Sequence, residues 1–303
     1  GDVDVYFDAP GIAPVLGQQV ATLTPGDISA PADYTEGDFV LILTAAGEPG
    51  TVLFTSDTLG LQAQSASTIG ILDADANELG QVAVRAFNAT GGLLTISDVN
   101  VQPTVRFFHA SAALATADIY NDDPTMFPPI VTNHAFGNIT GDIPVAAGLN
   151  SLTYTGAGDT ATILFEQELI VSVGTRLNYY VLGEADTLGA TGAIVDRRPV
   201  ETFVKFSILH AAFNHPIVDF YIVEADADIA DLPPFYFGVP AGTGPLSTNL
   251  QAGSFDLYLT EPGEKTIITG PIRMDIELGD IVDVIALDNV DPATVDLVFV
   301  PDP

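Results

Sequence analysis

Short apolar segments separated by turn residues follow one another along the whole chain. Residues 39–43, 161–165 and 295–300 are examples, each rich in β-branched or aromatic side chains. Gly, Pro, Asp and Asn interrupt such segments at roughly 8–12-residue intervals, and an apolar repeat of helical period is nearly absent. This pattern predicts an all-β protein made of β-sandwiches.

Three stretches of the chain are versions of one another. An apolar–Asp–apolar–Tyr element recurs as 3–6, 117–120 and 218–221, and a threonine follows each aspartate after 40, 37 and 41 residues. A further strand is expected to end 28, 27 and 27 residues beyond that threonine. The equivalent positions are Asp4, Thr44 and Leu72 in the first copy, Asp118, Thr155 and Leu182 in the second, and Asp219, Thr260 and Leu287 in the third.

The length of each copy indicates a complete domain. A period of roughly 100 residues is too long for a solenoid repeat and fits a small domain. We therefore predict three tandem immunoglobulin-like or transthyretin-like β-sandwiches, at residues 1–103, 104–200 and 201–303. The boundaries fall near Pro103 and near 197–199, in short joints with proline or charged residues.

The second and third copies begin with a strand that the first copy is expected to lack. Residues 105–110 and 205–211 precede the aspartate element, and each carries a histidine nine residues before the aspartate. The same position in the first copy falls before residue 1, so the first copy is expected to contain an open groove. Either the strand-like segment 93–97 or a strand of a neighbouring subunit would fill it. We expect 93–97 to form an added edge strand, and its insertion into the groove would make this copy a circular permutation.

The opening segments carry a family resemblance. Val-Arg-Phe-Phe-His-Ala at 105–110, followed by Asp-Ile-Tyr at 118–120, resembles domain-of-unknown-function family 4397. The resemblance is best over about 105–200, looser in the third copy, and begins only at the second strand in the first copy. It implies a secreted or surface module of bacteria or archaea with a sandwich-like β fold, often in tandem. It implies no activity and no catalytic residue.

The charge of the chain argues against nucleic acid as a partner and favours a location outside the cell. Forty Asp and Glu residues stand against eight Lys and Arg, which gives a formal charge of -32. Such a surface repels nucleic acid, and it suits a saline medium in which charges are screened. The chain has no cysteine, no run of 18 apolar residues and no signal peptide, and Gly1 is expected to be a mature terminus. We predict an extracellular or cell-surface protein with no membrane span.

The apolar content suggests that subunits associate. Mean hydropathy is +0.34 and only 16% of residues are charged, against about 25% in ordinary globular domains. Lysine, which commonly protects exposed sheet edges, occurs only at positions 205 and 265. We predict a head-to-tail homopolymer held by β-strand contacts between the two ends of the chain. The expected contact residues are Val3, Val5, Val295, Leu297 and Phe299.

Candidate chemistry is sparse. His109 and His210 occupy equivalent strand ends, so a packing or hydrogen-bonding role is expected for both. A dense acidic loop is a candidate weak calcium site, and its carboxylates are those of Glu224, Asp226, Asp228 and Asp231. The sequence shows no catalytic motif and no motif for an organic cofactor. Glycosylation sequons occur at Asn88 and Asn138.

These patterns predict a non-enzymatic extracellular structural protein. It would be the self-assembling subunit of a filament or surface layer. The alternative is a non-catalytic adhesin or carbohydrate-binding surface module, with a polysaccharide as partner.

Overall fold

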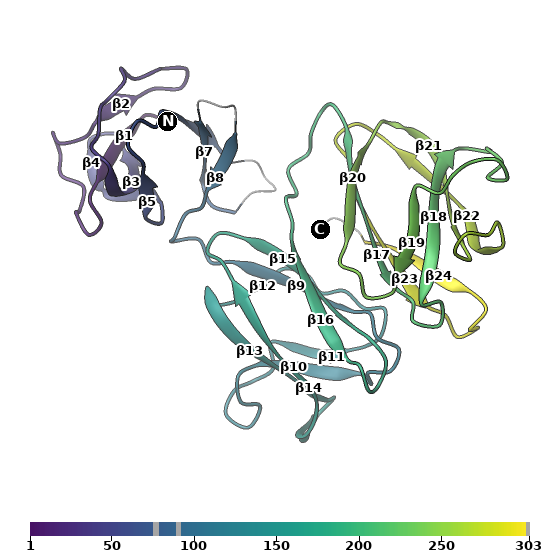
Figure 1. Cartoon of the computed structure of the whole chain (residues 1–303). Helices are drawn as coiled ribbons and strands as arrows, with labels where there is room; N and C mark the ends of the chain where they lie inside the picture. Colours follow the sequence, from purple (N-terminus) through teal and green to yellow (C-terminus); the bar gives the residue numbers. More distant parts are fainter. Residues whose placement is uncertain (75–78, 89–91, 301–303) are drawn as a thin grey trace. The chain divides into compact units, whose positions relative to one another are not determined.

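The computed structural model describes residues 1–74, 79–88 and 92–300. The described residues form 24 β-strands and no helix, and they contain no helical segment long and apolar enough to cross a membrane. The strands build six sheets that pair into tandem β-sandwiches (Figure 1). The predicted fold class is confirmed.

The strands are named here in three groups of eight, called repeats 1, 2 and 3. Repeat 1 contains β1 (Val3–Asp8), β2 (Ala21–Leu23), β3 (Gly37–Ala45), β4 (Glu48–Thr55), β5 (Leu59–Leu61), β6 (Ser67–Asp73), β7 (Val82–Asn88) and β8 (Leu93–Ile96). Repeat 2 contains β9 (Thr104–His109), β10 (Ala117–Asn121), β11 (Val131–His134), β12 (Ile143–Pro144), β13 (Gly148–Gly156), β14 (Asp159–Val171), β15 (Arg176–Leu182) and β16 (Gly189–Ile194). Repeat 3 contains β17 (Val204–Ala211), β18 (Ile217–Glu224), β19 (Tyr236–Pro240), β20 (Leu246–Leu250), β21 (Gly253–Thr260), β22 (Ile267–Ile276), β23 (Ile281–Asp288) and β24 (Val295–Val300).

Contacts divide the chain into two compact units. One unit consists of Gly1–Thr104 with two short segments of repeat 2, Val145–Gly148 and Val171–Thr175. The other holds the rest of repeat 2 together with repeat 3. The domain boundaries at 103 and 200 stay predictions.

Each repeat has a first and a second sheet. The first sheets have the strand orders β2-β1-β3-β4, β11-β10-β13-β14 and β19-β18-β21-β22, and in repeat 1 β5 also pairs with β3. The second sheets of repeats 2 and 3 are β12-β9-β15-β16 and β20-β17-β23-β24, whereas that of repeat 1 is only β6-β7-β8. Alternation along the strands sends one set of side chains between the two sheets. In repeat 3 this core includes Phe206, Phe220 and Leu257, and in repeat 1 it includes Leu43, Phe54 and Val84.

The expected alignment of the strand ending at Leu72 is wrong. Leu182 and Leu287 end central strands of their sheets and are 8% and 4% exposed, but Leu72 lies on the edge strand β6 and is 54% exposed. The central strand of repeat 1 is β7, which separates β6 from β8. Twenty-one residue positions lead from the end of β5 to the start of β7, against five from the end of β22 to the start of β23. Spacing alone misled the alignment because β6 is inserted there.

The predicted strand at 93–97 exists, but it does not occupy the vacant position. It is β8, at the edge of the second sheet of repeat 1. A bridge between Ser56 and Asp98 places the end of β8 beside the end of β4. In repeat 3, β24 likewise follows the central strand of its sheet and pairs antiparallel with it, as β8 does with β7. Therefore β8 corresponds to β24, and β6 takes the place next to the central strand that β17 holds in repeat 3.

The direction of β6 differs from that of the strand it replaces. β17 runs parallel to β23, whereas β6 runs antiparallel to β7 through seven paired residues. An inserted hairpin strand therefore fills the position that the sequence predicted to be empty. What repeat 1 lacks among the described strands is the next strand outward, the counterpart of β12 and β20.

Candidate functional site

The recurrent aspartate fastens a hairpin tip in every repeat. Asp4, Asp118 and Asp219 are at most 5% exposed. One carboxylate oxygen of each accepts a 2.8 Å hydrogen bond from a glycine N–H in the turn of the neighbouring hairpin. These glycines are Gly47, Gly158 and Gly263, with φ between +73° and +77°. Only glycine adopts that conformation at little cost, so the turn and the aspartate depend on each other.

The second oxygen of each aspartate holds the strand on the other side. It accepts a bond from the Thr22 hydroxyl in repeat 1 at 2.5 Å, from the Asn133 N–H in repeat 2 at 2.8 Å and from the Gly238 N–H in repeat 3 at 2.6 Å. The recurrent threonine lies directly across from the aspartate in all three repeats. Buried carboxylates that accept such bonds bind the surrounding backbone firmly, because an unpaired N–H would be costly. The sequence element is therefore structural.

The two equivalent histidines fasten loops. Each is 1% exposed. His109 Nε2 lies 3.3 Å from the Ala115 carbonyl oxygen, and His210 Nε2 lies 2.8 Å from that of His215. These contacts agree with the hydrogen-bonding role expected from the sequence. Burial lowers the pKa of both, that of His210 to about 4, so both rings are neutral at pH 7.

Repeat 2 adds a second buried histidine beside the first. The rings of His109 and His134 meet edge to face, with centroids 5.6 Å apart. Burial, and then the neighbouring His109, lower the pKa of His134 to about 4. His134 Nε2 lies 3.1 Å from the Asn138 carbonyl oxygen. Nothing in the sequence distinguishes His134, because it occurs in one repeat only.

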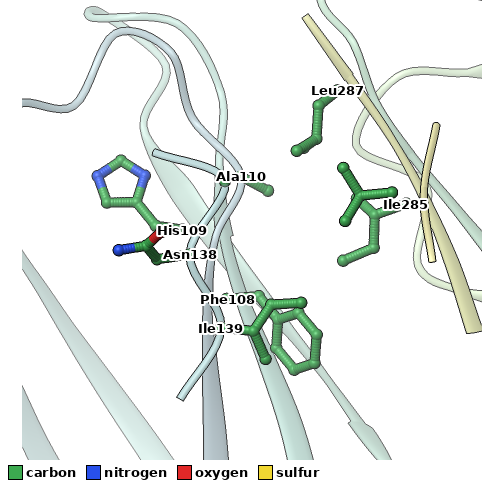
Figure 2. A pocket seen from close by; sticks show the side chains of 9 residues that line it. Phe108, His109, Ala110, Asn138, Ile139, Ile285 and Leu287 are labelled. Carbon is green, nitrogen blue, oxygen red and sulfur yellow. The ribbon is translucent and has the colours of Figure 1, made fainter. Parts of the chain in front are cut away.

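Repeats 2 and 3 pack the outer faces of their second sheets together. Residues alternate along β9 and β17, so that His109 and His210 point inward while their neighbours point to the interface. Figure 2 shows Phe108, Ala110 and Ile139 of repeat 2 opposite Ile285 and Leu287 of repeat 3. The buried apolar residues of this interface are Phe108, Ala110, Tyr180, Leu182, Leu209, Ala211, Ile285, Leu287 and Val300. The cavity between them has a volume of about 10 Å³, roughly the space of one water molecule.

Basic residues gather where repeat 2 passes into repeat 3. Arg197 is 4% exposed and bonds both carboxylate oxygens of Asp142, at 2.9 and 3.1 Å. Arg198 and Lys205 both pair with Asp196, at 2.6 and 3.1 Å. The hydrogen bonds from Arg198, then that from Lys205, outweigh burial and lower the pKa of Asp196. These ion pairs and the apolar interface account for the inclusion of both repeats in one compact unit.

The acidic loop after β18 is fastened by two basic side chains. Arg273 donates to Asp226 and to Asp256, both at 2.7 Å. Lys265 donates to the Tyr221 hydroxyl at 2.9 Å, to the Ile229 carbonyl at 2.7 Å and to the Leu232 carbonyl. Ile229 packs into a cluster with Tyr221, Val223 and Tyr258 on the outer face of the sheet. The loop is thus a strap held to the sheet by apolar contact and two cations.

The four predicted calcium ligands lie on this strap. Glu224, Asp226, Asp228 and Asp231 are all exposed. Asp226 is paired with Arg273, and Asp228 accepts a bond from the Ala230 N–H at 2.9 Å. Within the described ranges, no three side chains of His, Cys, Asp or Glu are grouped to hold a metal ion. Calcium binding by this loop stays a prediction.

The predicted contact residues differ in their surroundings. Val3 and Val5 are half-buried on the inner face of β1. Val295 is buried in the core of repeat 3, and Leu297 packs against that core. Phe299 follows them on the same side of β24 and is 39% exposed. On the other side, Val298 and Val300 contribute to the interface with repeat 2. β24 therefore uses both of its faces within its own chain, and its outer edge is the part left for a contact.

The two sequons lie at exposed positions. Asn88 ends β7, and the other two residues of its sequon fall outside the described residues. Asn138 is exposed, although its carbonyl oxygen is a bonding partner of His109 and His134. Glycosylation at either site stays a prediction.

Comparison with known proteins supports the family resemblance over part of the chain. Residues 103–221 match the model of a family described as a domain of unknown function (DUF4397). The matched region covers repeat 2 and the first two strands of repeat 3. No curated protein matches the chain.

Among solved structures, the TIE protein of Bacillus anthracis is similar at 11% sequence identity, with a TM-score of 0.21. The match covers 94% of this chain and 51% of that one, so this chain spans about half the length of that structure. A TM-score this low carries no argument about the chain.

Proposed function

We propose that this chain is a non-catalytic structural protein of the cell surface or extracellular space, and that it assembles with copies of itself through its β-sheets. The family resemblance over 103–221 and the charge of -32 support the location. In the proposed role the buried aspartates and histidines maintain the fold, and the surface of repeat 1 makes the contacts between subunits.

The distribution of exposed apolar side chains is the observation that carries the proposal. Of the 28 large apolar side chains that are strongly exposed among the described residues, 13 lie before residue 104, in about a third of the chain. Repeats 2 and 3 bury much of their comparable surface against each other. This uneven share of exposed apolar side chains favours a contact at repeat 1 over one at repeats 2 and 3.

Assembly also depends on the solvent. Two chains of charge -32 repel each other, and the range of that repulsion falls from about 10 Å at 0.1 M salt to about 3 Å at 1 M. Association is therefore expected to strengthen as salt is added.

The test is the particle itself. The purified chain is examined by negative-stain electron microscopy and by light scattering after size exclusion, at 0.1 M and at 2 M NaCl. We expect fibres, sheets or discrete oligomers at high salt. A monodisperse monomer under both conditions would overturn the proposal, and affinity of that monomer for polysaccharide would favour the adhesin alternative.

A further inference from the structure

The inner face of β1 is less covered than its counterparts. Val3 and Val5 point between the two sheets of repeat 1 and are only half-buried. Val218 and Phe220 hold the same places in repeat 3 and are completely buried. In repeat 2 the corresponding Ala117 and Ile119 are also completely buried. The difference shows that a covering element is lacking over this part of repeat 1.

The covering element in repeat 3 is the outermost strand of the second sheet. β20 pairs with β17 through five residues, and its Leu246 and Leu250 contribute to the core. In repeat 1, β6 holds the place of β17, and none of the described strands pairs with its outer edge. In repeat 1 the position that β20 fills in repeat 3, beside the outer edge of β6 and over the inner face of β1, therefore holds no described strand, and it is called here the β6 groove.

The chain segment that should supply this strand lies elsewhere. β20 is formed between β19 and β21, and the matching place in repeat 1, between β2 and β3, is segment 24–36. This segment forms no strand, and every one of its residues is exposed. Ile28 is 95% exposed. The segment therefore presents an isoleucine side chain that is accessible for a contact.

Segment 24–36 begins with a local turn and is held to the sheet near its end. Thr24 donates to the Asp27 carboxylate from its backbone N–H at 3.0 Å and from its hydroxyl at 2.8 Å. At the other end the Tyr34 ring packs edge to face on Phe7 and Phe39, with centroids 4.9 and 5.3 Å apart. The segment, called here the arm, is thus anchored at Tyr34, and Ile28 projects between that anchor and the turn.

We propose that residues 24–36 of a second copy of this chain occupy the β6 groove, with Ile28 over Val3 and Val5. The arm would add to the edge of β6 as β20 adds to β17, for about five residues before Pro31. Each copy offers one arm and one groove, and we propose a reciprocal exchange between two copies, which gives a two-fold dimer. The inference rests on the proposed self-assembly and names the surfaces that carry it.

A covalent trap tests the contact, since the chain has no cysteine of its own. Ile28→Cys is combined with Ile69→Cys, whose side chain lies on β6 and is 37% exposed. Under oxidising conditions at 2 M NaCl, the double variant is expected to give disulfide-linked dimers that require both cysteines. The matched control pairs Ile28→Cys with Val290→Cys, a fully exposed residue between β23 and β24. It is expected to remain uncrosslinked.

Three results would overturn the inference. One is a disulfide within a monomer, which would show that the arm fills its own groove. The second is no disulfide beyond that of the control. The third is equal crosslinking of the control.

A second variant separates this inference from the proposed function. Ile28→Asp is expected to weaken dimerisation by roughly tenfold or more, the factor that burial of one isoleucine side chain represents. Val290→Asp adds the same charge at an exposed turn and should change it less than about twofold. If both variants assemble like the parent, the arm-to-groove contact is refuted while self-assembly stands. If the parent chain itself stays monomeric, both proposals fail.

Discussion

Repeats 1 and 3 have the same arrangement of aspartate, glycine turn and threonine in their first sheets, called here the aspartate frame, but their second sheets differ. In both, a buried aspartate joins a glycine turn to the neighbouring strand, and the pairing of aspartate and threonine is the same. Repeat 3 then closes its core with four strands and covers the outer face of its second sheet with repeat 2. Repeat 1 has three strands there, one of them inserted and reversed. The frame therefore does not depend on how the second sheet is completed.

The largest predicted difference between repeat 1 and the other two repeats is in their stability at low pH. All four histidines lie in repeats 2 and 3, and the pKa of His134 and of His210 is lowered to about 4 in the fold, against about 6.5 in an unfolded chain. The unfolded state binds more protons between these values, so stability is full above pH 6.5 and falls as the pH drops toward 4. The two histidines together should cost on the order of 4 kcal/mol at pH 5 relative to pH 7.

Hydrogen exchange read by mass spectrometry checks this region by region. Peptides from β15 and β23 should lose protection at pH 5, after correction for the intrinsic exchange rate, while those from β7 should lose less. His210→Gln keeps a donor for the His215 carbonyl and should reduce the loss in repeat 3. Equal loss in β7 and β23 would contradict the prediction.

Side-chain truncation at equivalent positions of repeats 1 and 3 should then show how much the interface between repeats 2 and 3 contributes to stability. Leu287 is 4% exposed in the interface between repeats 2 and 3, and Phe87 is 45% exposed at the matching place on β7. Leu287→Ala should lower the free energy of unfolding by about 2–5 kcal/mol, the range for buried leucines. Phe87→Ala should lower it by about 0.5 kcal/mol in dilute, low-salt solution. Denaturant unfolding measures both, and similar values would remove the proposed contrast.

Calcium should have the smallest effect. Repeat 3 has the acidic strap, and a site of the strength usual in extracellular modules would add about 1–3 kcal/mol at 10 mM calcium. Because Arg273 already neutralises Asp226 and Asp256, the gain should be greater in Arg273→Ala. Calorimetry with calcium or with a chelator checks this. An unchanged melting temperature in both proteins would end the calcium hypothesis.

The strands, and the recurrence of an aspartate together with a threonine, could be predicted from the sequence. Alternation and turn residues predicted an all-β chain, and the aspartate and threonine anchors proved to be paired across the same two strands. Segment 93–97 was correctly predicted as an edge strand. Such features depend on local patterns and on contacts that recur at a constant spacing.

The sequence did not show which strands lie side by side in a sheet, or which side chains meet across the fold. The 67–73 strand has the composition of any other strand, so nothing in it shows that it would lie antiparallel to β7 in the place of a parallel strand. The strap cations were also missed, since Arg273 and Lys265 lie 42 and 34 residues after Asp231 and occur in one repeat only. A signal was available in their rarity, because a basic residue in so acidic a chain is expected to have a specific partner.

The aspartate frame bears on how the chain resists proteolysis. Proteases cut where the backbone can open locally, and exposed loop tips are among the usual targets. Here the tips at Gly47, Gly158 and Gly263 cannot open without breaking a hydrogen bond to a buried carboxylate. Cleavage should therefore begin in segments without this restraint, and the three sandwiches should persist as resistant fragments after their loops have been nicked.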